Sequence, residues 1–129
     1  MTSDAIPGTG PLSREQIEAI EATLLPTLDR HHLRLQAHCL ATFQHMARPA
    51  VQGPLPNRQR WQSWYKQQPQ LVDDPDFLEL LMIQFTVIAT QLEDLANNLG
   101  ISPLELSLDD LIRHSESDSR QRLESSKSS

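Results

Sequence analysis

Apolar residues recur at helical spacing along the first third of the chain. They fall at Ile17, Ile20, Leu24, Leu28, Leu35, Cys39 and Met46. At about 100° per residue, these positions stay within roughly a quarter of the helix circumference. Ser13, with Gln16 three residues later, forms a capping box that starts a helix. The phase continues through Pro26, so the pattern predicts one helix from Arg14 to about Arg48, kinked near Pro26. Two separate helices that share a phase are the alternative.

Two shorter helical elements are predicted farther along the chain. Asn57 caps a helix over residues 58–68, and the proline that follows ends it, because the residue before a proline avoids the helical region. A Ser-Pro pair at Ser102 starts a last short element, which Ser107 can restart as a second cap. The proline- and glycine-rich stretch over residues 49–56 predicts a stiff loop.

The most apolar helix is predicted between these two elements. Asp74 followed by Pro75 is a strong helix start, and the helix should run to Leu99 and stop at Gly100. Its first half is apolar on nearly every side, with Phe77, Leu78, Leu80, Leu81, Met82, Ile83, Phe85, Val87 and Ile88. Such a helix must be covered all round, either by its own bundle or by another subunit. We therefore expect the stretch around Met82 to have no hydrated side.

These patterns together predict an all-α fold. No alternating strand pattern competes with them, so residues 13–113 should form a bundle of four or five helices around the central apolar one. Residues 1–12 and 114–129 are polar or rich in glycine and proline, and they lack apolar periodicity. We expect both segments to be disordered tails.

The composition indicates a soluble protein. No basic region followed by an apolar run opens the chain, so we expect no secretory signal. The longest apolar stretch, residues 77–89, is shorter than the roughly 20 residues that span a bilayer, so no membrane contact is expected. A single cysteine, Cys39, excludes an internal disulfide and fits a reducing compartment. A cytoplasmic location follows from these features.

Charge is distributed in blocks of alternating sign. Residues 1–29 carry a net charge of −4 and residues 30–66 a net charge of +6, the latter without any Asp or Glu. Residues 67–112 carry −9 without any Lys or Arg, and the remainder carries +1. The total of −6 argues against a general nucleic-acid binder, but the basic block leaves room for a local patch. Basic and acidic helices that lie side by side are the simpler interpretation.

Catalytic and cofactor motifs are absent from the sequence. No phosphate-binding loop or dinucleotide-binding glycine motif occurs, so we expect no enzyme activity and no cofactor. His31, His38 and His45 are spaced seven apart, which is too far for two of them to share one metal on a helix. We expect no metal site, and these histidines are interpreted as residues at the boundary of the core. A metal shared across a dimer interface and a pH-responsive contact are the alternatives.

The segment "LANNLGISPLEL" resembles the middle of a helix-turn-helix. Ala96 and Gly100 match its small residue and turn glycine, and Leu95, Leu99, Ile101 and Leu106 occupy its apolar positions. The resemblance covers about 20 residues and implies DNA binding. The recognition helix would carry Glu105, Asp109 and Asp110, however, and an acidic helix repels phosphates. The turn is therefore interpreted as structural.

Two stretches are candidate contact surfaces. The first is the basic, aromatic segment over residues 57–68, with Arg58, Arg60, Trp61, Trp64 and Tyr65. It can be a seam of the core, a protein interface or a nucleic-acid contact, since Trp, Tyr and Arg serve all three. The second is "LELSLDDLI", with Leu104, Leu108, Asp109, Asp110 and Leu111, which can fold onto the bundle or enter a partner's groove.

These observations favour a non-enzymatic protein that acts by binding another protein, as an adaptor, an assembly factor or a regulator. The sequence does not identify that partner. Homodimer formation through the helix over residues 77–88 would cover its apolar surface. The alternative function is a nucleic-acid-associated regulator in which the basic block contacts phosphates and the aromatic residues stack on bases.

Overall fold

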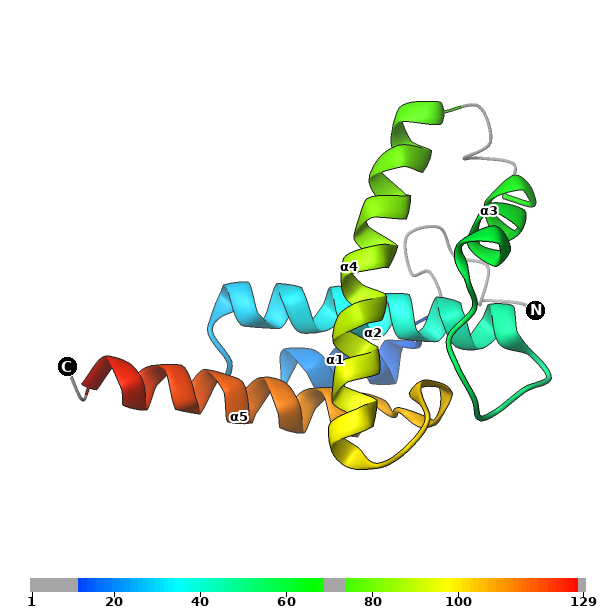
Figure 1. Ribbon diagram of the computed structural model, residues 1–129. Coiled ribbons are helices and arrows are strands. Elements are labelled where there is room, and N and C mark those ends of the chain that lie inside the picture. The colour runs from blue at the N-terminus through cyan, green and yellow to red at the C-terminus, as the bar shows by residue number, and fades with distance from the viewer. Residues whose placement is uncertain (1–11, 69–73, 128–129) are drawn as a thin grey trace. The chain divides into compact units, whose positions relative to one another are not determined.

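The computed structural model describes residues 12–68 and 74–127 (Figure 1). Within them lie five α-helices and one short 3-10 helix, and none of these residues forms a strand. The predicted all-α fold class is confirmed. The predicted N-terminal tail, apart from Leu12, lies outside the described residues. The elements are α1 (Arg14–Glu21), α2 (Thr27–Ala47), α3 (Arg58–Lys66), α4 (Pro75–Leu99), η2 (Pro103–Glu105) and α5 (Leu108–Lys127).

The chain divides into two compact units. Unit 1 contains the described residues up to Ala41 together with those from Ser107 onward, and unit 2 contains Thr42–Leu106. Unit 1 thus holds α1, most of α2 and α5, whereas unit 2 holds the last residues of α2 with α3, α4 and η2.

The predicted kink near Pro26 is wrong, because the chain forms two helices there. The capping box at Ser13 and Gln16 is present, with backbone-to-side-chain hydrogen bonds of 3.1 and 2.9 Å. Helix α1 ends at Glu21, and α2 begins only after Pro26, whose carbonyl accepts from the Arg30 N–H. A proline just before a helix loses no ladder hydrogen bond, whereas a proline inside one does. The chain adopts this less costly placement.

Two leucines of the predicted apolar stripe are consequently outside the core. Leu24 lies between the helices and is 99% exposed, and Leu28 in the first turn of α2 is 80% exposed. Ile20 and Cys39, by contrast, are buried as predicted. The predicted stripe thus leaves the core at the break between α1 and α2.

The C-terminal segment is more ordered than its composition suggests. Residues 114–127 belong to α5, so the prediction of a disordered tail is wrong for them. The Arg122 guanidinium donates to the Asp29 carboxylate of α2 at 2.9 Å and lies 3.3 Å from Asp118 on its own helix. Ser119 is buried. A polar helix of this kind keeps its fold through such contacts rather than through a wide apolar face.

Unit 2 is organised around α4, which contacts both α3 and η2. The helix starts at Asp74 and Pro75 and ends at Gly100 as predicted; Gly100 has a left-handed φ of 73°, which a residue without Cβ adopts readily. The backbone N–H of Ile101 then closes the helix end on the Ala96 carbonyl at 3.0 Å. In the segment that resembles a helix-turn-helix, only η2 follows this turn, and α5 does not begin until Leu108.

A single glutamine fastens the end of α2 to the segment around η2. The side-chain amide of Gln44 donates to the Leu104 carbonyl at 3.1 Å and to the Leu106 carbonyl at 3.0 Å. The preceding loop is attached to the same segment, because the Gly53 N–H donates to the Ser102 hydroxyl at 2.8 Å. The loop and η2 are therefore held together by polar contacts.

Replacing Gln44 by Met should destabilise the protein while preserving the volume of the side chain. The two carbonyls would lose a partly buried donor, so we expect the free energy of unfolding to fall by about 1–3 kcal/mol. Denaturant unfolding followed by circular dichroism measures the change. The control is Gln62→Met on the exposed side of α3, which should stay within about 0.5 kcal/mol of wild type. Equal stability of the two variants would contradict the role given to Gln44.

Cys39 should be chemically inert in the folded protein. Its side chain is 1% exposed, and burial raises the pKa of the thiol to about 12, so the reactive thiolate is scarce at pH 8. We expect labelling by Ellman's reagent to be at least about a hundredfold slower in the native than in the denatured protein. A Leu123→Cys variant in a Cys39→Ala background, with an exposed thiol, should label rapidly without denaturant. Fast labelling of native Cys39 would refute this prediction.

Candidate functional site

The aromatic segment predicted over residues 57–68 forms a seam of the core. Asn57 caps α3 by accepting from the Arg60 N–H at 3.0 Å, which sets the phase of the helix. The Trp61 ring is then stacked on Phe43, with centroids 5.6 Å apart, and meets Phe85 edge-on at 5.5 Å. Phe43 and Phe85 touch each other at 5.0 Å. Three rings from α2, α3 and α4 thus form one aromatic cluster inside unit 2.

The other two aromatic residues of α3 differ in exposure. Tyr65 is 2% exposed, and its hydroxyl donates to the Asp74 carbonyl at 2.8 Å. Trp64 is only half-buried, with its ring centroid 6.1 Å from that of Phe85. Of the three rings proposed as contact groups, Trp61 and Tyr65 are therefore committed to packing, and Trp64 alone presents surface to a ligand.

The arginines of α3 lie outside the core. Arg58 and Arg60 are both exposed. The Arg60 guanidinium donates from Nη2 and Nε to the Met46 carbonyl, at 2.8 and 3.3 Å. Arg60 and Trp64 line a cavity of about 130 Å³ at the end of α2, together with His45, Met46, Arg48 and Gln67. We refer to this cavity as the Arg48–Arg60 pocket.

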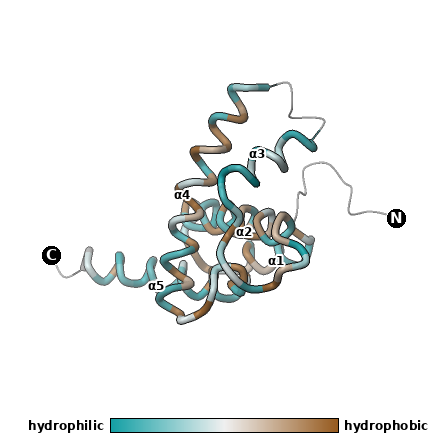
Figure 2. The backbone as a smooth tube through the Cα atoms, turned by 45° about the vertical axis from the view of Figure 1, so that its right-hand side comes forward, coloured by the Kyte–Doolittle hydropathy of each residue, from teal (hydrophilic) through white to brown (hydrophobic). Residues whose placement is uncertain are grey.

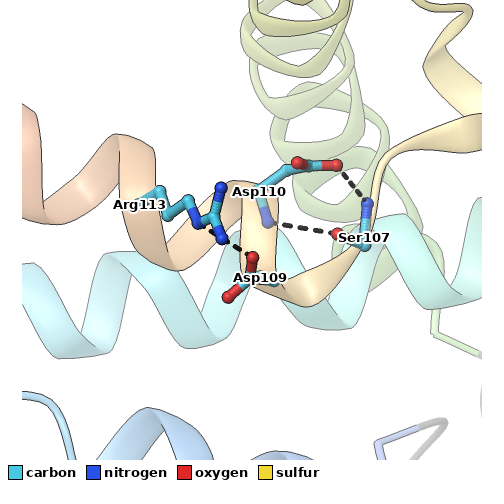
Figure 3. Close-up of polar contacts among 4 residues, drawn as sticks. All are labelled: Ser107, Asp109, Asp110 and Arg113. Carbon is cyan, nitrogen blue, oxygen red and sulfur yellow. Dashed lines mark hydrogen bonds and ion pairs between the residues drawn. The ribbon is translucent and has the colours of Figure 1, made fainter.

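The second predicted surface, around Leu104 and Leu108, is mostly engaged within the protein. Leu104 and Leu111 are 5% and 1% exposed, so they present little surface to a partner, and Leu108 is partly exposed. Ser107 and Asp110 cap α5 reciprocally at 3.1 and 2.9 Å, and Asp109 pairs with Arg113 at 2.9 Å (Figure 3). The acidic residues therefore serve the start of α5.

An exposed apolar surface lies where the sequence predicts full coverage. Leu80, Ile83 and Val87 on α4 are 65%, 58% and 51% exposed, and we call them the α4 stripe. The expectation that the stretch around Met82 has no hydrated side is wrong. Figure 2 shows hydrophobic positions throughout the first half of α4.

The α4 stripe and the buried side of α4 lie on opposite faces of the helix. The buried residues are Met82, Phe85, Ile88, Ala89, Leu92, Leu95 and Ala96. At about 100° per residue, the mean direction of this set is nearly opposite to that of the stripe. Both sets repeat at helical spacing, so the sequence identifies two apolar faces but does not reveal which one the protein itself covers.

Carboxylates lie at both ends of the α4 stripe. Asp76 and Glu79 lie at its beginning and Asp94 two turns beyond its end, and all three are exposed. Helix geometry places Asp76, Val87 and Asp94 along nearly the same line. Residues 67–112 contain no Lys or Arg, so no cation of this stretch offsets their charge. The stripe is thus an apolar strip with acidic ends.

The histidines of α2 form no chemical site with one another. His31, His38 and His45 are all exposed along the helix. Partial loss of solvent and the nearby charge of Arg34 lower the pKa of His38. Over residues 12–68 and 74–127, no three His, Cys, Asp or Glu side chains gather as they would around a metal ion. No helix in the part of the chain that the structure describes has the length and apolar character needed to cross a membrane.

Comparison with known proteins identifies the family. Neither the curated proteins nor the solved structures include a match to this chain. The family model described as "NDH complex assembly factor CRR9" matches residues 12–122, which includes every helix from α1 to α4 and most of α5. The match thus covers both units and most of the chain. The protein belongs to the CRR9 family of NDH complex assembly factors.

Proposed function

We propose that the protein assists assembly of the NDH complex without catalysis, by binding a protein component of that complex through the α4 stripe. The family description supports a role in assembly of the NDH complex. The exposed α4 stripe is the single observation that supports binding of a partner at this surface. Leu80, Ile83 and Val87 form a continuous apolar row on a regular helix, which suits docking of a partner's helix or strand.

The charge around the stripe favours a partner of different composition over a second copy. Two copies paired antiparallel through this row would bring Asp76 and Glu79 of one against Asp94 of the other, and like charges at an interface are repulsive. A segment with an apolar face flanked by Lys or Arg would instead meet complementary charge. Homodimer formation is therefore the less favoured use of the stripe.

Nucleic-acid binding is the alternative function, and the aromatic packing weighs against it. Stacking on bases needs exposed rings, and Trp61 and Tyr65 are buried. The acidic stretch over residues 67–112 also repels phosphates. A protein partner suits these features better.

The double substitution Ile83→Ser with Val87→Ser should abolish recovery of the partner. Burying one such side chain contributes about 1.5–3 kcal/mol, so losing two should weaken binding by about a hundredfold or more. The measurement is affinity purification of the tagged protein from its own cells, with quantification of NDH complex subunits by mass spectrometry. We expect wild type to recover them and the double variant not to.

Two controls make this test specific. Val51→Ser alters an apolar residue that is 76% exposed in a loop of the same unit, and it should recover the subunits as well as wild type does. Sedimentation of the pure protein tests self-association. Undiminished recovery by the double variant would reject the stripe as the contact, and a wild-type dimer that the double variant converts to monomer would replace the heterologous partner by a second copy.

A further inference from the structure

The Arg48–Arg60 pocket gathers basic residues from separate parts of the chain. His45 and Arg48 come from the end of α2 and the residue after it, whereas Arg60 comes from α3. All belong to unit 2 and to the stretch over residues 30–66 that contains no Asp or Glu. Among the ion pairs formed by the described residues, none involves Arg48 or Arg60. The pocket therefore carries positive charge that these residues leave uncompensated.

Arg60 is held in position by an uncharged acceptor. Its Nε and Nη2 atoms donate to the Met46 carbonyl, a neutral acceptor that fixes the guanidinium but leaves its full charge. A guanidinium has five N–H donors in a planar fork, so others remain for a ligand oxygen. A fixed guanidinium that makes no ion pair with the described residues is well suited to a carboxylate.

Trp64 adds an apolar wall to this charged cavity. Its ring is half-buried against Phe85, so one part is supported by the core while another lines the pocket. A carboxylate on an aliphatic stem would place its oxygens near the arginines and its methylene groups against the indole. The side chain of Glu has this form.

The pocket is separate from the α4 stripe. Trp64 approaches α4 at Phe85, which is on the buried face of that helix, whereas the stripe occupies the opposite face. A ligand in the pocket would therefore not cover Leu80, Ile83 or Val87, and the two surfaces can be tested independently.

We infer that the Arg48–Arg60 pocket binds a glutamate-bearing acidic segment of a partner protein. A protein segment is favoured over RNA because one half-buried ring cannot form the row of stacking platforms that single strands use. The pocket is also a single cavity with few hydrogen-bond donors. A site of this kind matches one side-chain carboxylate. This inference is independent of the proposed use of the stripe.

The test measures binding of a fluorescein-labelled peptide in which glutamates surround a single leucine, by fluorescence anisotropy with the full-length protein. A peptide with glutamine at the same positions should bind at least about tenfold more weakly. Arg48→Gln should weaken binding of the glutamate peptide by a similar factor. The matched control is Arg58→Gln, which removes an exposed α3 cation that does not line the pocket and should change the affinity less than about twofold.

Each remaining outcome decides the question. Equal binding of both peptides, or equal weakening by Arg48→Gln and Arg58→Gln, would overturn the inference, because general charge attraction would then suffice. Tighter binding of single-stranded oligouridine, falling steeply with added salt, would assign the pocket to nucleic acid instead. The Ile83→Ser and Val87→Ser double variant should bind the glutamate peptide like wild type; a loss there would refute the separation of the two surfaces.

Discussion

The packing of Phe43, Trp61 and Phe85 is the constraint on which unit 2 depends. Each ring comes from a different helix, and each of the three rings contacts the other two. Aromatic pairs of this kind contribute about 0.5–1.5 kcal/mol beyond the area they bury. Because the cluster fixes the rotation of both α3 and α4 about their axes, it determines which residues of each helix face solvent. The half-buried position of Trp64 and the exposed position of the α4 stripe both follow from this rotation.

The α4 helix illustrates how one sequence pattern allows two structural outcomes. Apolar residues on every side of a helix require cover, and the protein provides it on the face that carries Met82 and Phe85. The opposite face remains exposed, and exposed apolar surface is energetically unfavourable in water unless a partner covers it. The proposed recruitment of a partner through one face and the packing of the other face inside unit 2 divide a single helix between two roles.

Local signals in the sequence predicted most helix boundaries, because capping chemistry acts over a few residues. Ser13, Asn57, Asp74 and Gly100 all occupy the cap positions assigned to them. The sequence does not predict the helix break at Pro26, because a proline fits equally well inside a kinked helix or just before the first turn of a new helix. Only the packing of the neighbouring residues decides between the two. Residues 114–127 were assigned to a tail since their few apolar residues do not form a face. One contact of this segment joins Arg122 to Asp29. The two residues are 93 positions apart along the chain, so no local pattern reveals their pairing.

The candidate surfaces were harder to predict than the fold, for a related reason. Residue type identified Arg58, Arg60 and the three aromatic residues of α3 as contact groups, but burial separates Trp61 and Tyr65 from Trp64. The participation of Arg48 and His45 in a common cavity with Arg60 depends on the return of the chain after α2. Nothing in the local sequence around 57–68 contains that information. Tertiary arrangement, rather than composition, therefore distinguishes packing residues from those available for contact.

The acceptor that holds Arg60 is a main-chain oxygen, and this has a consequence for variation of the sequence. The Met46 carbonyl is present whatever side chain occupies that position, so replacements at 46 that keep α2 helical leave the anchor of the guanidinium in place. Lysine at position 60 would retain the charge but lose the planar fork that bonds through two nitrogens. A flexible cation loses conformational freedom when it binds an anion. The Arg60 side chain has already lost this freedom during folding, because the Met46 carbonyl holds its guanidinium.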